Sequence, residues 1–205
     1  MSMTETQIDA LVKGFATCAV ANVSDNLNRM VGARGLLPYH RGGSMCGRAL
    51  TVRTAPGDNA AIHRAFDQVR PGDVVVVDGA GYLDRALTGG IMAAIARSRG
   101  AVGLVVDGAI RDVEEIAAGD FPVFARGISH LGPYKNGPGE IGVPVSIGGM
   151  LVSPGDIVLG DADGIVAFAP AIGPTLLEAT RAQARKEAEI MAQIAAGTYI
   201  GAYAK

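Results

Sequence analysis

The feature that most constrains the fold is an unbroken run of four valines at residues 74–77, between Pro71-Gly72-Asp73 and Asp78-Gly79. Alternate side chains of a strand point to opposite faces, so a continuous apolar run bounded by turn residues is typical of a strand covered on both faces. Such strands lie in the middle of sheets that are flanked by helices. The run therefore predicts a central strand in a layered α/β structure.

The segments after this strand alternate between helical and strand patterns. Residues 91–99 have helical spacing, 102–106 form a second apolar run, 113–118 form a short helix, and 121–124 form a third strand. Helices in this region end in basic residues or glycine, as helix C-termini often do. The order predicts three parallel strands with right-handed crossovers, and therefore a central part-parallel sheet.

The two ends of the chain show different patterns. Thr4 and Gln7 have the spacing of a capping box at the start of a helix, and Ser24 or Asp25 is a candidate cap for a second, weaker helix. The expected elements before the valine run are helices at 4–15 and 24–30, a strand at 45–54 and a helix at 58–68.

From residue 144 onward, short strands with Gly and Pro turns predict an antiparallel region at 145–147, 150–152, 157–159 and 165–168. The segment Pro154-Gly155-Asp156 before one of these strands repeats Pro71-Gly72-Asp73, which indicates two similar turn-strand units. Residues 174–196 predict a long C-terminal helix with a narrow apolar stripe. Such a stripe fits a helix on the surface or one that packs on a neighbouring subunit.

Composition excludes several classes of function. With 205 residues, 49% of them apolar, the chain suits a single domain at 1–205. The net charge is −2 and the 18 Lys and Arg residues are scattered, so we expect no nucleic-acid partner. Every apolar stretch is interrupted well before the roughly 20 residues of a membrane helix, so we expect no membrane span. Cys18 and Cys46 lack metal or redox spacing and residues 1–13 do not resemble a signal peptide, which predicts a cytoplasmic protein with free thiols.

The first candidate site is the turn Thr88-Gly89-Gly90-Ile91-Met92, between a predicted strand and a predicted helix. The first N–H groups of a helix have no partner within the helix, and the helix dipole adds positive charge, so a carboxylate can bind there. Two glycines, which have no side chains, allow an anion to approach the backbone closely. The alternative is that the glycines only serve the geometry of the chain. The pair is neither a P-loop nor a GxGxxG motif, so nucleotide binding and methyl transfer from a nucleotide cofactor are disfavoured.

The second candidate site is Arg111-Asp112, at the carboxyl end of the next parallel strand, where open α/β sheets usually bind ligands. Arg111 can hold a carboxylate or enolate with two hydrogen bonds, and Asp112 can bind a hard cation directly or through water. The alternative is structural, because Asp112 and Glu115 also have the spacing of a capping box. Asn59 and His63 lie four apart on a predicted helix and are weaker candidates. His40 and His130 have no second ligand at metal spacing, so no zinc site is expected.

Together these motifs resemble those of the RraA-like family, which joins the 4-hydroxy-4-methyl-2-oxoglutarate aldolases with the regulators of ribonuclease activity. The resemblance covers most of the chain. It rests on Gly89-Gly90, Gly100, Gly103, Asp107-Gly108-x-x-Arg111-Asp112, Ser24-Asp25-Asn26-Leu27, Gly47-Arg48-Ala49-Leu50-Thr51-Val52, the segment 71–78 and Gly160-Asp161-Ala162-Asp163-Gly164-Ile165-Val166. It implies a swivelling β/β/α fold, assembled as a trimer or hexamer with active sites between subunits.

The resemblance also implies roles for individual residues. Arg111 would bind pyruvate and Asp112 would bind Mg²⁺ or Mn²⁺, while the amides of Gly90, Ile91 and Met92 would hold the pyruvyl carboxylate. The sequence departs from the aldolases at Gly90, 21 positions before Arg111, where they carry an acidic residue.

This departure leaves three possibilities. The cation is held mostly through water, another acid such as Asp84 takes over, or aldolase activity is lost. In the aldolases a glutamate from the neighbouring subunit's C-terminal helix also contributes, for which Glu187 and Glu189 are the candidates.

The resemblance predicts a metal-dependent class II aldolase or lyase that acts on short 2-oxo acids. Cleavage of 4-hydroxy-4-methyl-2-oxoglutarate would yield a pyruvate enolate, and loss of carbon dioxide from oxaloacetate would yield the same enolate. No lysine lies within 86–112, which argues against a Schiff-base route. Residues 134–140 or another subunit would recognise the rest of the substrate. The alternative is a non-enzymatic regulator that binds a ribonuclease or an RNA helicase.

Overall fold

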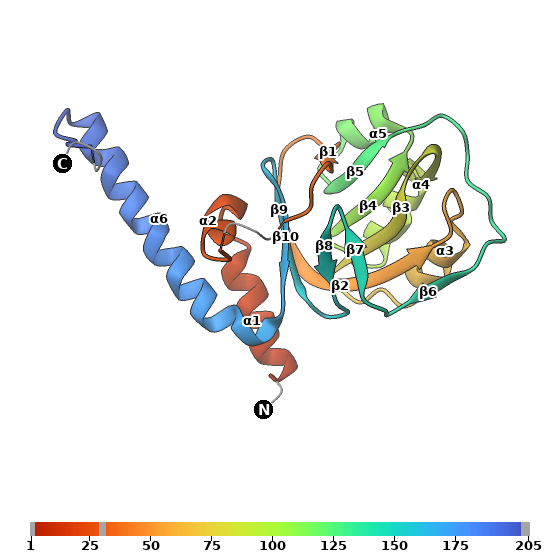
Figure 1. The fold of residues 1–205 in the computed structure, drawn as a ribbon, viewed down its shortest axis with the longest axis horizontal. Helices are drawn as coiled ribbons and strands as arrows, with labels where there is room; N and C mark the ends of the chain where they lie inside the picture. Colours follow the sequence, from red (N-terminus) through yellow and green to blue (C-terminus); the bar gives the residue numbers. More distant parts are fainter. Residues whose placement is uncertain (1–2, 29–31, 202–205) are drawn as a thin grey trace.

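The four-valine run lies in the middle of a mixed sheet in the computed structural model, which describes residues 3–28 and 32–201 (Figure 1). The parallel strands are, in sheet order, β2 (Met45–Thr54), β3 (Asp73–Thr88), β4 (Gly103–Ile110) and β5 (Val123–Ile128). The three predicted parallel strands are therefore confirmed, and β2 extends the parallel region by one strand. β3 is much longer than the valine run, and its pairing with β4 is interrupted by register shifts after Asp78.

Antiparallel strands complete the sheet on both sides. They are β1 (Leu37–Pro38) beside β5, β9 (Ile157–Asp161) beside β2, β10 (Gly164–Phe168) beside β9, and β6 (Gly139–Ile141) beside the end of β2. A separate hairpin is made by β7 (Val145–Ile147) and β8 (Met150–Val152). The predicted antiparallel region is confirmed. β1 and β6 were not predicted, because their few residues lie among the Gly and Pro turn residues at 35–43 and 137–144.

Both faces of the central strand are covered. Val75 and Val77 pack into one apolar cluster with the helices α3 (Ala60–Phe66), α4 (Gly90–Ser98) and α5 (Val113–Ala118). Val74 and Val76 pack into another, with the β7–β8 hairpin. Burial on both faces is the reason why this strand is a continuous apolar run.

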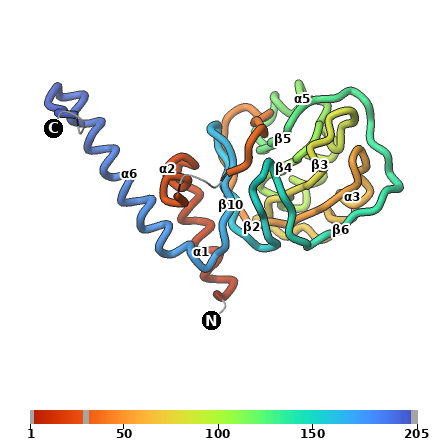
Figure 2. Tube along the Cα trace, viewed as in Figure 1, coloured from red at the N-terminus to blue at the C-terminus, as the bar shows by residue number. Residues whose placement is uncertain are grey.

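Helices from both ends of the chain pack on β9 and β10. They are α1 (Glu5–Phe15), α2 (Val20–Asp25) and α6 (Gly173–Ala195), which follows a short 3-10 helix, η1 (Pro170–Ile172). Figure 2 shows α1 and α2 between α6 and the sheet, and α6 leads away from the sheet toward the C-terminus. The long C-terminal helix is thus confirmed. Of the described helices, none is long and apolar enough to cross a membrane.

The first two helices show one correct and one wrong prediction. Thr4 caps α1 with the predicted capping box to Gln7. The second helix spans Val20–Asp25 instead of 24–30, so Ser24 and Asp25 lie at its end and not at its start; residues 29–30 lie outside the described residues. Its N-terminus is held by Asp161 Oδ2, which accepts a hydrogen bond from the N–H of Val20 at 2.9 Å.

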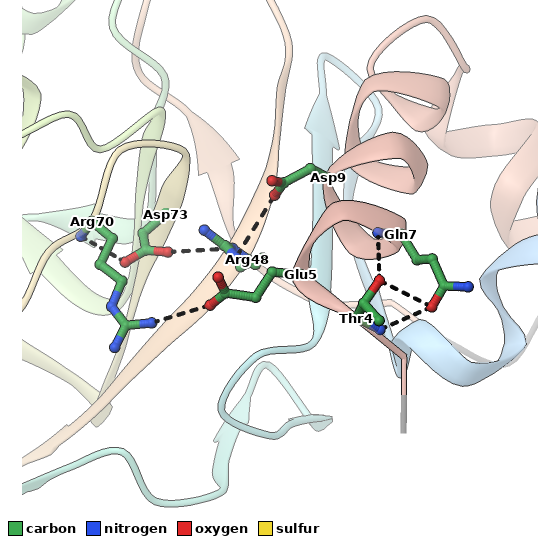
Figure 3. A network of polar contacts seen from close by, with 7 residues as sticks. All are labelled: Thr4, Glu5, Gln7, Asp9, Arg48, Arg70 and Asp73. Atoms are coloured by element: carbon green, nitrogen blue, oxygen red, sulfur yellow. Dashed lines mark hydrogen bonds and ion pairs between the residues drawn. The ribbon is translucent and has the colours of Figure 1, made fainter. Parts of the chain in front are cut away.

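The two turn-strand units have the same local geometry. In each, the aspartate at the start of the strand accepts a hydrogen bond from the N–H three residues earlier, Asp73 from Arg70 and Asp156 from Ser153, both at 2.8 Å. Burial raises the pKa of both carboxyl groups. The predicted similarity is confirmed. Figure 3 shows that the first unit also anchors α1 to the sheet, through ion pairs from Glu5 to Arg70 (3.8 Å), Asp9 to Arg48 (3.7 Å) and Arg48 to Asp73 (4.0 Å).

Candidate functional site

The first candidate site is the turn that connects β3 to α4. Gly89 is the N-cap, with an extended backbone, and α4 begins at Gly90, one residue before the expected range 91–99. The N–H of Gly90 donates to Asp112 Oδ2 at 3.1 Å. Among the described residues none accepts a hydrogen bond from the N–H groups of Ile91 or Met92. These two N–H groups, together with the helix dipole, can hold an anion.

The second candidate site, Arg111-Asp112, lies directly beside this turn. The N–H of Arg111 donates to the carbonyl of Thr88 at 3.1 Å, so the ends of β3 and β4 are joined there. Asp112 is the N-cap of α5, but its side chain makes no capping hydrogen bond, so the capping-box alternative is wrong. The Asp112 carboxylate turns toward Gly90 of the neighbouring helix instead. Arg111 Nε lies 3.7 Å from Asp112 Oδ2.

The backbone of Asp112 is in the left-handed region, with φ 57° and ψ 37°. This conformation costs a residue with a side chain about 1–2 kcal/mol, although aspartate tolerates it better than most. Strained residues of this kind are concentrated at functional sites. In this conformation the Asp112 carboxylate lies at the start of α4, where it accepts the hydrogen bond from the N–H of Gly90.

Both candidate sites open into one pocket. It is lined by Asn59, His63, Leu87, Thr88, Gly89, Ile91, Met92, Arg111, Asp112, Pro133 and Lys135. The structure therefore brings together most of the residues that the sequence singled out, the weaker candidates Asn59 and His63 included. Gly90 lies at the edge, where it lines a neighbouring hollow with Glu115.

Two buried polar side chains in this pocket have unsatisfied atoms. Asn59 and Thr88 are each only 3% exposed. Asn59 Nδ2 donates to the carbonyl of Leu87 at 3.1 Å, but within the described part of the chain Asn59 Oδ1 and Thr88 Oγ1 have no hydrogen-bond partner. A buried polar atom without a partner costs about 1–3 kcal/mol, so such atoms indicate a place where a ligand or water binds.

The charged groups of the pocket favour an anionic ligand. Burial and the positive charge of Lys135 lower the pKa of His63, so its imidazole is neutral at pH 7. Arg111 and Lys135 are cations, whereas Asp112 is the carboxylate that lines the pocket. A small acid with an additional oxygen acceptor matches this arrangement.

Lys135 was not singled out from the sequence, although residues 134–140 were expected to recognise part of the substrate. Its loop is fixed by Asp58, whose Oδ2 accepts hydrogen bonds from the N–H groups of Asn136 (2.8 Å) and Gly137 (2.7 Å). Burial alone would raise the pKa of Asp58, but these bonds and one from Ala60 lower it. The only sequence feature related to this contact was the polar pair Asp58-Asn59 before a predicted helix. That pair does not indicate that the loop carrying Lys135 packs against it.

Three weaker candidates lie outside this pocket. Asp84 is exposed on the outer part of β3 and is not among the residues that line the pocket, so its role as a replacement acid stays a prediction. Glu187 on α6 accepts hydrogen bonds from Asn22 (2.8 Å) and Gln183 (2.9 Å) of its own chain. Glu189 is exposed on the same helix. The expected role of the two glutamates concerned a neighbouring subunit and stays a prediction.

The donor groups at the site restrict the kind of metal ion that fits. Among the described residues, no three or more His, Cys, Asp or Glu side chains are grouped to hold a metal ion. Asp112 and Glu115, however, both bring a carboxylate against the Gly89-Gly90 turn. One or two carboxylates and a water shell are what Mg²⁺ or Mn²⁺ requires, so the residues fit a hydrated divalent cation.

The sequence profile of the RraA-like family, described as "Aldolase/RraA", matches residues 20–167. The chain belongs to the RraA-like family. The match includes the Gly89-Gly90 turn, Arg111-Asp112 and the loop that carries Lys135. The structure bears out the fold class that the resemblance implied, an α/β fold with a central mixed sheet and a long C-terminal helix.

Individual relatives carry different names. A Halalkalibacterium halodurans protein, provisionally named a 4-hydroxy-4-methyl-2-oxoglutarate aldolase, is 38% identical over 167 residues, which are 81% of this chain and 79% of that protein. The structure of Streptomyces coelicolor RraAS2, described as an unusual member of the RNase ES inhibitor RraA family, has a TM-score of 0.79 and 25% identity over 87% of this chain and 93% of that chain. A Geobacillus kaustophilus structure titled as an S-adenosylmethionine:2-dimethylmenaquinone methyltransferase has a TM-score of 0.69 and 34% identity over 74% of this chain and 94% of that chain. The three names point to different activities.

Proposed function

We propose that this protein is a lyase that breaks a carbon–carbon bond in short 2-oxo acids and releases pyruvate. The observation that carries the proposal is the pocket in which Arg111 and Asp112 converge with the N–H groups of Ile91 and Met92, which have no partner among the described residues. These groups match a pyruvyl unit, which has a carboxylate beside a carbonyl oxygen. The aldolase name of the H. halodurans relative supports the same chemistry.

The residues of the pocket act on different parts of the substrate. The N–H groups of Ile91 and Met92 bind the carboxylate, and the guanidinium of Arg111 donates hydrogen bonds to the 2-oxo oxygen. As the bond between C3 and C4 breaks, negative charge develops on this oxygen, and Arg111 stabilises it where such electrostatic help has the largest effect. Neutral His63 accepts the 4-hydroxyl proton of a 4-hydroxy-2-oxo acid as the C3–C4 bond breaks, and returns this proton to C3 of the enolate, which gives pyruvate. The cation Lys135 binds the second carboxylate of a dicarboxylic substrate.

A divalent cation, Mg²⁺ or Mn²⁺, held by Asp112 is part of the proposal. When bound, it polarises the 2-oxo group and lowers the energy of the enolate. Asp112 turns its carboxylate toward the pocket because its backbone is left-handed. Decarboxylation of oxaloacetate follows from the same arrangement, because it produces the same enolate without removal of a hydroxyl proton.

We also propose that the chain works as a homo-oligomer, a trimer or hexamer, in which α6 packs on a neighbouring subunit. α6 leads away from the sheet (Figure 1), and its C-terminal part exposes Met191 (64%) and Ile194 (50%). Glu187 is engaged by Asn22 and Gln183, which leaves Glu189 as the better candidate to reach a neighbouring site. The free thiols of Cys18 and Cys46 support a reducing, cytoplasmic location.

The test is pyruvate release from oxaloacetate and from 4-hydroxy-4-methyl-2-oxoglutarate, followed with lactate dehydrogenase in Mg²⁺, Mn²⁺ or EDTA. We expect metal-dependent release that falls at least about 100-fold in Arg111→Ala, because this residue stabilises the developing charge. Arg97→Ala is the matched control. It removes an arginine from α4 that forms an exposed ion pair with Asp120 (2.8 Å), and its activity should equal that of the wild type. No release from either substrate would refute the proposal.

The second candidate function is that of a non-enzymatic regulator, favoured by the likeness to the RNase ES inhibitor family member from S. coelicolor. A regulator would bind a ribonuclease or RNA helicase through an exposed surface, and its binding would not depend on Arg111. Pull-down with a purified ribonuclease of the RNase E type distinguishes the two functions. Binding that survives Arg111→Ala, combined with no turnover, would support the regulator.

A further inference from the structure

The carboxylate of Glu115 occupies the space beside Gly90 that a side chain would fill. A Cβ atom on Gly90 would lie 2.6 Å from Glu115 Cδ and 2.9 Å from Oε1, and closer still to Oε2. Real Cβ atoms essentially never come this close to another group. Glu115 comes from α5, is exposed, and has no hydrogen-bond or ion-pair partner among the described residues. Its carboxylate is therefore available to a ligand at the start of α4.

Asp112 reaches the same turn. Its Oδ2 accepts a hydrogen bond from the N–H of Gly90, and a Cβ atom on Gly89 would overlap it. Two carboxylates that are three residues apart in the chain thus converge on one pair of glycines. Neither side chain makes a capping hydrogen bond to α5.

A second, independent observation indicates a polar ligand in the pocket that Asp112 lines, next to the hollow that Glu115 lines. Asn59 Oδ1 and Thr88 Oγ1 are buried, line the same pocket as Asp112, and lack partners among the described residues. Each would be satisfied by a water molecule. A divalent cation that keeps most of its water shell supplies such molecules, whereas a dry cation in a protein cage does not.

We infer that Glu115 is the second carboxylate for the divalent cation at Asp112, and takes the place of a side chain that Gly90 lacks. The inference rests on the proposed function, because it concerns the cation used there. Glu115 binds the cation directly or through one of its water molecules, and α5 presents both acids from its first turn. A carboxylate at position 115 of this chain would thus do what an acidic side chain at position 90 does in the aldolases, which is to supply the second acid for the cation.

The test is a Mn²⁺ titration in which the electron paramagnetic resonance signal measures free Mn²⁺. Glu115→Gln keeps the shape of the side chain and removes the charge, and we expect its Kd for Mn²⁺ to rise about 10- to 100-fold. Glu114→Gln is the matched control, because it removes the same charge from the adjacent position and should change Kd less than about threefold. Thermal unfolding in EDTA should be the same for both variants, which separates cation binding from a structural role.

A swap of the acid tests the position directly. Glu115→Ala should weaken Mn²⁺ binding, and adding Gly90→Asp in the same chain should restore it, because the new carboxylate enters the vacated space. Equal Mn²⁺ affinity of the wild type and Glu115→Gln, or no Mn²⁺ binding by the wild type, would overturn the inference. If pyruvate release is metal-dependent but the affinity is unchanged in Glu115→Gln, only this inference fails. If Glu115→Gln weakens Mn²⁺ binding but no substrate is cleaved, the proposed function fails and the inference stands.

Discussion

Asp58 should be the residue on which the position of Lys135 depends. It is 2% exposed, and its carboxylate accepts three backbone hydrogen bonds, from Ala60 (2.8 Å), Asn136 (2.8 Å) and Gly137 (2.7 Å). Hydrogen bonds to a charged group contribute about 1.5–3 kcal/mol each. Asp58→Ala would remove all three, a loss comparable to the whole stability of a small domain. Asp58→Asn is the more informative variant, because it keeps one acceptor oxygen.

We expect Asp58→Asn to lower the free energy of unfolding by about 2–3 kcal/mol, through loss of the charge and of at least one hydrogen bond. With a urea m value of about 2 kcal/mol/M, the midpoint of unfolding falls by about 1–1.5 M. The KM for oxaloacetate should rise more than kcat falls, because Lys135 is displaced. Asp67→Asn, which breaks an exposed ion pair with Arg99, is the control and should cost less than about 1 kcal/mol. A change below about 0.5 kcal/mol in Asp58→Asn would refute this reasoning.

The contribution of Asp58 also has a defined pH dependence. The folded protein lowers the pKa of this carboxyl below its unfolded value of about 3.9. The stabilisation is therefore fully present above about pH 4 and is lost as the pH falls through the lower folded pKa. Urea midpoints measured between about pH 2 and pH 5 should fall less steeply in Asp58→Asn than in the wild type. Equal slopes would contradict the prediction.

Three further predictions concern other sites. Because the folded protein lowers the pKa of His63, the unfolded chain takes up a proton on this residue at a higher pH than the folded protein does. The free energy of unfolding therefore falls as the pH drops below about 6.5. In His63→Gln, the midpoint of urea unfolding should depend less on pH in that range. Burial raises the pKa of Cys46 to about 12, so iodoacetamide at pH 8 should label this thiol only after unfolding, as peptide mass spectrometry can show. Gly47→Ala should lower the free energy of unfolding by more than about 2 kcal/mol, because its Cβ would overlap the carbonyl of Gly72. Gly119→Ala is the control: its Cβ would make a single contact at 3.6 Å and should change the free energy of unfolding by less than about 0.5 kcal/mol. Urea unfolding measures both variants.

Features whose signals lie within a few residues could be predicted from the sequence. The four valines between turn residues determined a strand with two covered faces, and Thr4 with Gln7 determined the start of α1. The glycine turn at residues 88–92 was placed correctly between β3 and α4. In each case the sequence pattern is set by the local geometry of one strand, helix start or turn.

Features that depend on distant partners could not be predicted. α2 begins four residues before its expected start because Asp161, from β9, accepts a hydrogen bond from the N–H of Val20. Asp112 and Glu115 matched a capping box, yet both side chains turn to the neighbouring helix. Lys135 enters the pocket because the loop is held by Asp58, which is 77 residues away in sequence. These pairings depend on tertiary packing, which a local pattern does not contain.

The most direct test of the proposed site is a crystal structure of the protein with Mn²⁺ and oxalate, a stable analogue of the pyruvate enolate. We predict an anomalous Mn²⁺ peak beside the carboxylate of Asp112, and oxalate on the N–H groups of Ile91 and Met92 with Arg111 on its other side. Oxalate and Mn²⁺ bound elsewhere, with this pocket holding only water, would contradict the account.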